Sequence, residues 1–416
     1  MTLKKRMTPK SQAALKKLIK DSVKPTKYRP LFWKLNVSVL LICFVFKYLP
    51  REDFVTGEHL TQQCEYDTRE LCADCFRETT DCDFFRQRIR IRTDDLANIL
   101  IDPFDPQRVL FAQLDGQQSV VVRNLNLNSK MESLRNELCR ELNITRSDCR
   151  LANDERFLKR LRRRVLDKSV VDGCTVCPSG DMKALGWLLL EFTETELLDL
   201  LLIRTNAQPL MLKMLGKHGF PVPKLIFQGG FTLIESDDGQ TMNHFYNSPL
   251  KVRLKIALAL LEASLQFTDG VGRFRFYLTD ISPSNIAVQV LASGKVQVSF
   301  LDLANIFIVD RQSERIADQQ KAVHTRIECD RCIAFVKEEL CFHQESDINS
   351  FATCNLLWED YNGYPKGFLH NEEEYHQLAE IETLLDHCVQ CVPPKCQDRH
   401  KILQNIQRMI RLMLAY

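Results

Sequence analysis

Three polar residues in the second half of the chain have the types and spacing needed for chemistry at a metal-bound phosphate. Asp280 is followed five residues later by Asn285, and Asp302 comes after two intervening apolar runs. An aspartate can accept a proton from an attacking hydroxyl, while an asparagine oxygen and a second carboxylate can bind a divalent cation. If the fold brings the three side chains together, the pattern indicates phosphoryl transfer.

A β-hairpin between Asn285 and Asp302 is the element that would bring them together. Residues 285–291 and 295–301 read as strands, and Ala292-Ser-Gly294 is typical of a turn. This arrangement resembles the catalytic loop, metal-binding Asn and second metal-binding Asp of protein kinases. The spacing alone also fits turn residues and a strand cap, so both interpretations stay open.

The other predicted elements place strands mainly before helices. Alternating apolar residues predict strands, and apolar residues every three to four positions predict helices. In chain order we predict a hairpin at 108–125 that turns at Asp115-Gly116, helices at 130–141 and 185–203, two short strands within 221–235, a helix at 249–266, and mainly helices after 329. Strands followed by helices, in two unequal parts, indicate an α+β fold.

A basic run lies within residues 145–205, which we interpret as an insertion. The run is Arg156-Phe-Leu-Lys-Arg-Leu-Arg-Arg-Arg-Val165. A solvated helix face is the ordinary explanation for such a run. A contact for an acidic partner and a processing site at Arg160-Leu-Arg-Arg163 are the alternatives.

The first 49 residues predict a membrane anchor. Residues 1–30 contain ten lysines and arginines against one acid, and residues 31–49 are uncharged except for Lys34 and Lys47. Lysines at such positions can extend toward the bilayer interfaces. By the positive-inside rule we expect a cytoplasmic tail at 1–30, a transmembrane signal anchor at 31–49 and a lumenal or extracellular remainder. A cleaved signal peptide and a buried soluble helix are the alternatives.

Fifteen of the 16 cysteines follow the apolar segment, and their grouping indicates disulfide bonds. They are Cys64, Cys72, Cys75, Cys82, Cys139, Cys149, Cys174, Cys177, Cys329, Cys332, Cys341, Cys354, Cys388, Cys391 and Cys396. Such groups are typical of oxidising compartments, although the C-x2-C pairs also fit zinc sites. No histidine stands at zinc-finger spacing, so we expect disulfides, with one thiol left free or paired to another chain. Asn143-Ile-Thr145 is a potential glycosylation site in this topology.

Longer patterns are similar to the deleted-in-autism branch of the divergent protein kinase domain family. The similar segments are Cys72-x2-Cys75-Phe-x5-Cys82, Val109-Leu-Phe-Ala-Gln113, Val120-Val-Val-Arg-Asn-Leu125, Tyr277-Leu-x-Asp280-x-Ser-x-x-Asn285-x-Ala-Val288, Val309-Asp310, Cys329-Asp-x-Cys332-x8-Cys341 and Cys354-Asn-Leu-Leu. They cover the chain from about residue 60 to its end. The cysteine spacings are the most specific part of the resemblance.

The resemblance implies a two-lobed, disulfide-rich, protein-kinase-like fold of the secretory pathway. It implies a cysteine-rich lumenal stem at 50–85, an N-lobe at 86–236 that contains the insertion, and a C-lobe at 237–416. The expected location is the Golgi or endoplasmic reticulum membrane, as a single-pass type II protein, with secretion as an alternative.

Carried over residue by residue, the resemblance assigns a nucleotide site. Asp280 matches the catalytic Asp, and Asn285 and Asp302 match the two metal ligands, with ATP and Mg²⁺ or Mn²⁺ as cofactors. Arg123 stands where the family's phosphate-binding lysine would be. Its helix carboxylate is Glu132 or Glu137; we place Glu137 in the nucleotide site but leave the choice open.

Several departures from the kinase pattern place activity in doubt. The planar guanidinium of Arg123 differs in shape from an ammonium group. No G-x-G-x-x-G precedes Arg123, which leaves the Asp115-Gly116 turn as the phosphate cover. Ser282 stands where the catalytic-loop lysine is usual, and Asp302-Leu-Ala lacks the usual glycine.

Two functions follow from these observations. The first is an active lumenal kinase that phosphorylates hydroxyls on an unknown lumenal or extracellular protein or glycan. The second is a catalytically inactive pseudokinase that binds a receptor or client. An ion pair of Arg123 with a helix carboxylate favours the first, and a pair with Asp302 in a filled cleft favours the second. We expect no nucleic-acid partner, and residues 145–205 contain no calcium-loop motif.

Overall fold

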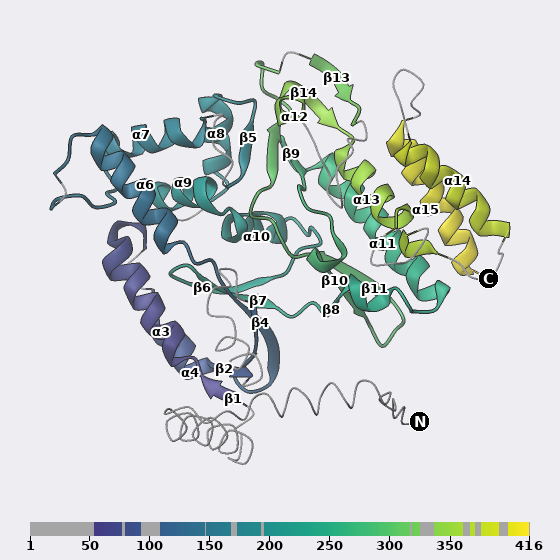
Figure 1. The fold of residues 1–416 in the computed structure, drawn as a ribbon, viewed down its shortest axis with the longest axis horizontal. Coiled ribbons are helices and arrows are strands. Elements are labelled where there is room, and N and C mark those ends of the chain that lie inside the picture. The colour runs from purple at the N-terminus through teal and green to yellow at the C-terminus, as the bar shows by residue number, and fades with distance from the viewer. Residues whose placement is uncertain are drawn as a thin grey trace, which may run out of the picture. The chain divides into compact units, whose positions relative to one another are not determined.

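The computed structural model in Figure 1 describes the part of the chain that follows the predicted anchor. The described residues are 54–76, 80–92, 109–145, 147–167, 173–192, 195–316, 318–324, 337–360, 367–370, 376–390 and 398–415. The predicted tail at 1–30 and anchor at 31–49 lie outside them. Within these ranges, no helix combines the length and apolar character that a bilayer crossing requires.

A six-stranded antiparallel sheet forms the first part of the fold. Its strands follow the order β1 (Phe54–Thr56), β2 (Ile89–Arg92), β3 (Val109–Leu114), β4 (Gln118–Asn124), β7 (Thr232–Ser236) and β6 (Leu225–Gly229). The predicted hairpin at 108–125 is confirmed as β3 and β4, with Leu114 opposite Gln118. Leu110, Ala112 and Leu114 alternate onto one face, where they are buried.

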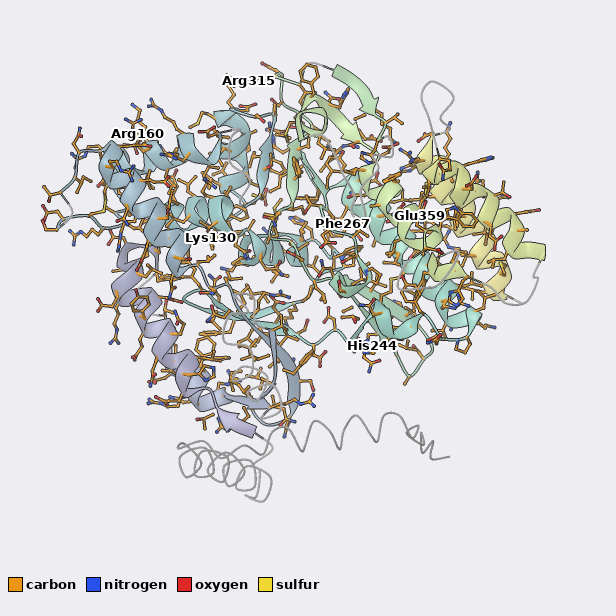
Figure 2. The ribbon with its side chains drawn as sticks, in the orientation of Figure 1. Lys130, Arg160, His244, Phe267, Arg315 and Glu359 are labelled. Atoms are coloured by element: carbon orange, nitrogen blue, oxygen red, sulfur yellow. A yellow bond between two sulfur atoms is a disulfide. The ribbon has the colours of Figure 1, made fainter. Side chains whose placement is uncertain are left out.

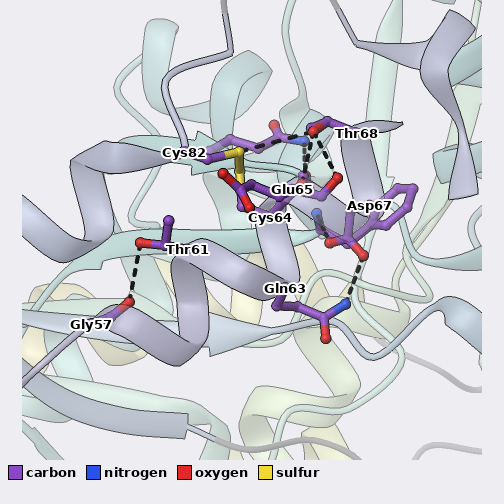
Figure 3. The surroundings of a disulfide bond; sticks show 11 residues. Gly57, Thr61, Gln63, Cys64, Glu65, Asp67, Thr68 and Cys82 are labelled. Atoms are coloured by element: carbon purple, nitrogen blue, oxygen red, sulfur yellow. Dashed lines mark hydrogen bonds between the residues drawn. A yellow bond between two sulfur atoms is a disulfide. The ribbon is translucent and has the colours of Figure 1, made fainter. Parts of the chain in front are cut away.

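Residues predicted to form a stem contribute directly to this sheet. β1 pairs with β2 at its edge, and the segment then forms α3 (Glu58–Glu65), the π-helical η1 (Tyr66–Leu71), η2 (Ala73–Cys75) and α4 (Asp83–Arg88). A disulfide between Cys64 and Cys82 ties these elements together (Figure 3). Leu60, Phe84 and Phe85 then pack in one apolar cluster with the buried face of the sheet.

In the sequence, helices lie between the sheet strands β4 and β6. They are α6 (Asn128–Glu141), α7 (Glu155–Val165), α8 (Met182–Leu189), α9 (Glu196–Thr205) and α10 (Gln208–Lys217). The predicted single helix at 185–203 is therefore wrong, because the chain breaks it into α8 and α9. The hydroxyl of Thr195 accepts a hydrogen bond from the Leu198 N–H at 3.3 Å and so starts a new helix.

One strand of this insertion joins the second part of the fold. β5 (Thr175–Cys177) pairs in parallel with β12 (Phe307–Asp310), whose other neighbour is the antiparallel β9 (Phe274–Tyr277). A disulfide from Cys177 to Cys341, 164 residues away, fixes the same strand to α12 (Lys337–Phe342). The insertion is thus fastened to the second part of the fold at β5, by strand pairing and by a disulfide.

The second part of the fold is mostly helical (Figure 1). Its elements are η3 (Met242–Phe245), α11 (Leu250–Asp269), α13 (Ile348–Trp358), η5 (Gly367–Leu369), α14 (His376–Val389) and α15 (Arg399–Ala415). Two small sheets accompany them, β8 (Gln240–Thr241) with β10 (Ile286–Val290) and β11 (Val296–Phe300), and β13 (Asp318–Ala322) with β14 (His343–Ser346). The predicted α+β composition agrees with this arrangement.

The segment between β7 and β8 connects the two parts. Gly239 lies there at φ +104°, and a Cβ at this position would come within 2.4 Å of the Val288 carbonyl oxygen. Only glycine tolerates both that backbone conformation and that approach. This connection therefore depends on a residue with no side chain.

The expected disulfide framework is present. Among the described residues the disulfides are Cys64–Cys82, Cys72–Cys75, Cys139–Cys149, Cys177–Cys341 and Cys354–Cys388. Cys174 is a buried free thiol in the same described set, and burial raises its pKa to about 12. Cys174 and Cys177 are three residues apart, yet they do not form a disulfide with each other.

Candidate functional site

Asp280 and Asn285 are in direct contact. Both lie on the loop between β9 and β10, where η4 (Pro283–Asn285) turns the chain into the hairpin. The Nδ2 group of Asn285 donates to Oδ2 of Asp280 at 2.7 Å, and Asp280 is exposed to solvent. The loop therefore presents a carboxylate and an amide to the same side.

Asn285 and Asp302 flank the open end of the predicted hairpin, which is confirmed as β10 and β11. Ile286 is opposite Phe300, and the Leu301 N–H donates to the Asn285 carbonyl at 2.9 Å. Asp302 therefore directly follows Leu301, the residue whose N–H is bonded to Asn285. One carboxylate oxygen of Asp302 accepts the Ala304 N–H at 3.0 Å, and its other oxygen has no hydrogen bond within the described part of the chain. The hairpin therefore places the backbones of Asn285 and Asp302 side by side at one end.

A buried asparagine anchors the strand that leads into this loop. Asn349, at the start of α13, accepts a hydrogen bond from the Leu278 N–H at 3.0 Å and donates to the Phe276 carbonyl at 2.8 Å. It is 0% exposed. The Tyr277 hydroxyl accepts a hydrogen bond from the Ser346 N–H at 2.8 Å, and burial raises the pKa of this hydroxyl to about 12. The loop that contains Asp280 thus starts from a fixed strand end.

Arg123 forms its ion pair within the sheet. Its Nε donates to Oε1 of Glu235 on β7 at 3.1 Å, and Glu235 is 1% exposed. Its Nη2 also donates to the Leu301 carbonyl at 3.4 Å. Burial raises the pKa of the Glu235 carboxyl, whereas Arg123 and Gln208 act in the opposite direction. The arginine therefore links the sheet to the residue before Asp302.

Neither carboxylate proposed as the helix partner of Arg123 contacts it. Glu137 on α6 accepts a hydrogen bond from Arg164 of α7 at 3.1 Å, and Glu132 is exposed. The expected pairing of Arg123 with Glu132 or Glu137 is therefore wrong, because Arg123 pairs with Glu235. The reason is that α6 packs with α7 and α9, whereas Arg123 faces a strand neighbour that already supplies a carboxylate.

Gln208 holds the backbone on both sides of Asp302. From the first turn of α10, its amide nitrogen donates to the Leu301 carbonyl at 2.9 Å and its amide oxygen accepts the Leu303 N–H at 2.7 Å. It also contacts Glu235 and is 2% exposed. A buried amide with all these bonds fixes the peptide that contains Asp302.

The Asp115-Gly116 turn lies at the wrong end of its hairpin to cover phosphates at Arg123. Leu114 is opposite Gln118 beside the turn, but Val109 is opposite Arg123 at the other end. Five residues along a strand separate these ends by roughly 16 Å. The chain that leaves β2 and enters β3 near Arg123 is 93–108, which lies outside the described residues. The expectation that the Asp115-Gly116 turn covers phosphates at Arg123 is therefore wrong.

The face of the sheet that presents Arg123 also has apolar surface. Val109 is directly opposite Arg123, and Phe111 is directly opposite Val121. Because side chains two apart on a strand share a face, all four point to the same side. Val109 is 41% exposed and Phe111 39% exposed. Apolar surface therefore lies beside the Arg123 cation on this face of the sheet.

Metal binding at this site would rest on few protein ligands. No cluster of three or more His, Cys, Asp or Glu side chains is placed to hold a metal ion anywhere in the described ranges. Asp302 supplies a carboxylate and Asn285 an amide oxygen, both of which suit Mg²⁺ or Mn²⁺ when phosphate oxygens complete the coordination.

Three contributing residues were missed in the sequence. Glu235 had a weak signal, because it is a single acid in the otherwise apolar or neutral strand Thr232-Leu-Ile-Glu-Ser236. Gln208 and Asn349 had none, since a buried amide is identified only by its partners. Arg123 and Glu235 come from the six-stranded sheet of the first part, whereas Asp280, Asn285 and Asp302 flank β10 and β11 in the second.

Comparisons with known proteins find similarity to kinase-domain proteins. A family model described as the protein-kinase domain of FAM69 matches residues 200–391. A protein named Divergent protein kinase domain 2A from Xenopus tropicalis is 28% identical over 348 residues, 75% of this chain and 79% of that protein. The protein of that name from Homo sapiens is 28% identical over 70% of this chain and 75% of its own length.

A solved structure, the complex of Rv3197 with erythromycin from Mycobacterium tuberculosis, aligns with 70% of this chain and 68% of that one. Its sequence identity is 14% and its TM-score 0.24, which is too low to support an argument.

Proposed function

We propose, from the premise that this chain belongs to a divergent protein kinase family, that it binds ATP with Mg²⁺ or Mn²⁺ and transfers the γ-phosphate to a hydroxyl. The supporting observation is the joint placement of Asn285 and Asp302 at the open end of one hairpin, with Asp280 bonded to Asn285. Kinase chemistry needs these three residue types around one phosphate.

Each residue has a distinct part in this proposal. Asp280, which is exposed, accepts the proton of the attacking hydroxyl once Asn285 turns toward the metal. Asn285 and Asp302 bind the metal ion, which neutralises charge on the phosphates. Arg123 is oriented by Glu235 and contacts phosphate oxygens through the guanidinium nitrogens that Glu235 does not use.

A specific observation also favours the second function, a pseudokinase. The Asn285 amide donates to Asp280, so it occupies the carboxylate that would act as base. Ser282 bonds to Ser284 at 3.0 Å and provides no cation near the transferred phosphoryl group. A binding module for a protein partner would keep this arrangement without turnover.

Residence in the secretory pathway is the second element of the proposal. Disulfides persist in oxidising compartments, which supports a lumenal or extracellular position for the chain after residue 50. Asn143 of the potential glycosylation site is exposed. The proposed topology is a type II Golgi or endoplasmic reticulum protein anchored through residues 31–49, with secretion as the alternative, and its substrate is a lumenal or extracellular protein or glycan.

The test is phosphate transfer by the purified full-length chain from a secretory host. Transfer from labelled ATP, with Mg²⁺ or Mn²⁺, is measured for wild type, Asp280→Asn and Asp302→Ala. Asp269→Asn is the matched control, because Asp269 is exposed at the end of α11. Transfer lost only in the two site variants supports the kinase. Nucleotide binding detected by thermal shift, without transfer, supports the pseudokinase. The absence of both transfer and nucleotide binding would reject the nucleotide site.

A further inference from the structure

The basic helix α7 is held rigidly by one set of its side chains. Phe157, Leu158 and Leu161 are buried, and the Asp154 side chain caps the first turn by accepting the Phe157 N–H at 2.9 Å. A helix with a packed apolar stripe and a capped start has little freedom to reorient. Its polar side chains therefore project in fixed directions.

Two of its arginines are neutralised by neighbouring acids. Arg162 bonds to Glu196 on α9 at 2.6 Å and to Glu155 at 3.0 Å. Arg164 bonds to Glu137 and Glu141 on α6. These inward pairs occupy the carboxylates of Glu137, Glu141, Glu155 and Glu196.

The outer face of α7 has an unpaired basic stripe, formed by Arg156, Lys159 and Arg163. All three are exposed, and none has an ion pair or hydrogen bond within the described part of the chain. Arg160 extends the stripe as a paired member: its side chain is 40% exposed, and its Nε forms a long ion pair with Glu141 at 3.7 Å. At about 100° per residue these four fall within roughly 100° of arc and extend about 10 Å along the helix.

The chemistry of the stripe points to a flexible polyanion. Repeated positive charges on one line favour repeated negative charges, and such binding is weakened by salt. The apolar side chains of α7 at 157, 158 and 161 are buried, so the exposed face offers no apolar surface for a protein core or a lipid tail. Short runs rich in Lys and Arg are typical of nucleic-acid or heparin sites.

We propose that this stripe binds a sulfated polysaccharide of the heparin type. The disulfides decide between the polyanions, because proteins that keep disulfides occupy compartments where nucleic acid is not the resident polyanion. Sulfate groups stay ionised at all physiological pH values, and guanidinium groups pair with them through two hydrogen bonds. The surface holds the protein on a glycan while the nucleotide site stays separate.

The position of α7 agrees with this separation. In Figure 1 the helix lies at the edge of the molecule, away from β10 and β11, and Figure 2 shows Arg160 at that same edge. A chain bound along the stripe does not have to approach Asp280 or Asp302. The proposal does not depend on phosphoryl transfer.

The experiment compares heparin binding by three forms of the full-length chain. Wild type is compared with Arg156→Ala/Lys159→Ala/Arg163→Ala and with a control that loses equal charge, Lys217→Ala/Lys401→Ala/Arg408→Ala. The control residues are exposed on α10 and α15. The stripe variant should bind roughly tenfold more weakly or worse, with a slope of log affinity against log salt that is smaller by about 2 to 3. The control should match wild type.

A site-resolved measurement removes the common background from the basic residues 1–30. Acetylation of each lysine is followed by mass spectrometry with and without a heparin oligosaccharide. Protection of Lys159, without protection of Lys217 and Lys401, supports the stripe. Equal binding by all three forms, equal loss in both variants, unprotected Lys159, or equally tight binding of desulfated heparin or polyglutamate would overturn the proposal.

Discussion

Arg123 on β4 and Glu235 on β7 form a diagonal ion pair across adjacent strands, 3.1 Å from Nε to Oε1. Glu235 is directly opposite Val121, two residues from Arg123 on the same face. The carboxylate that orients the proposed phosphate-binding cation therefore comes from the sheet itself. In many kinases helix movement controls the equivalent pair, whereas here both partners lie on strands of one sheet.

Glu235→Gln should weaken both folding and nucleotide binding. Removing one partner of a buried pair leaves a charge without compensation and costs about 3 to 5 kcal/mol. Because Arg123 is 18% exposed, water can reach it and we expect the lower part of that range. Chemical denaturation and ATP-dependent thermal shifts measure the two effects.

The matched control is Glu137→Gln, which removes a contact to Arg164 rather than to Arg123. It should leave the nucleotide-dependent shift unchanged. If the shift is lost in the Glu137 variant and kept in the Glu235 variant, the result would support pairing of Arg123 with Glu137 instead.

Gln208→Ala should lower metal-dependent nucleotide binding more than it lowers stability. Two buried hydrogen bonds to the backbone at 301 and 303 are lost, which costs about 1 to 3 kcal/mol. The Asp302 peptide is then no longer fixed from both sides. Mn²⁺ titration in the presence of nucleotide reports the change.

Gln266→Ala is the comparison, since this side chain makes one hydrogen bond to the Gly219 carbonyl near the surface. Unaltered Mn²⁺ affinity in the Gln208 variant would show that Asp302 is positioned without it.

Cys177→Ser/Cys341→Ser should destabilise the protein more than Cys72→Ser/Cys75→Ser. The first bridge closes 164 residues and the second closes 3. Chain-entropy arguments give about 5 kcal/mol for the long loop and about 2 kcal/mol for the short one. Denaturation midpoints of the two double variants test the order. Equal midpoints would mean that the pairing of β5 with β12 already holds the insertion.

Asp67 should make the protein less stable as the pH rises from 4 to 7. Burial raises the pKa of this carboxyl from 3.8 to about 6, against hydrogen bonds from the Phe231 N–H and Gln63, the second of which is drawn in Figure 3. The folded state binds the proton more tightly than the unfolded state. The stabilisation is therefore present below pH 4 and is lost through pH 6, by about 3 kcal/mol.

Asp67→Asn should flatten that dependence. The introduced amide does not titrate, and the Gln63 amide can rotate to accept from it. Free energies of unfolding of both forms, measured from pH 4 to pH 8, give the difference. Parallel curves would show that Asp67 is not the group responsible.

The sequence predicted the local parts of the site well. The Asp280 to Asn285 spacing and the turn at Ala292-Ser-Gly294 determine the loop and the hairpin, because both depend on residues close in the chain. The disulfide framework followed from cysteine grouping, although its pairing did not. The helix break at Thr195 was missed, although the polar run Thr193-Glu-Thr-Glu196 interrupts the apolar pattern there.

What the sequence by itself determined is the set of chemical groups: Asp280, Asn285, Asp302, a cation at 123 and an abundance of cysteines. What only the tertiary structure decided is which groups meet. Glu235 is 112 residues from Arg123, and Gln208 is 93 residues from Leu301. Strand register and helix packing bring these residues together, and both depend on the whole buried core rather than on any local pattern.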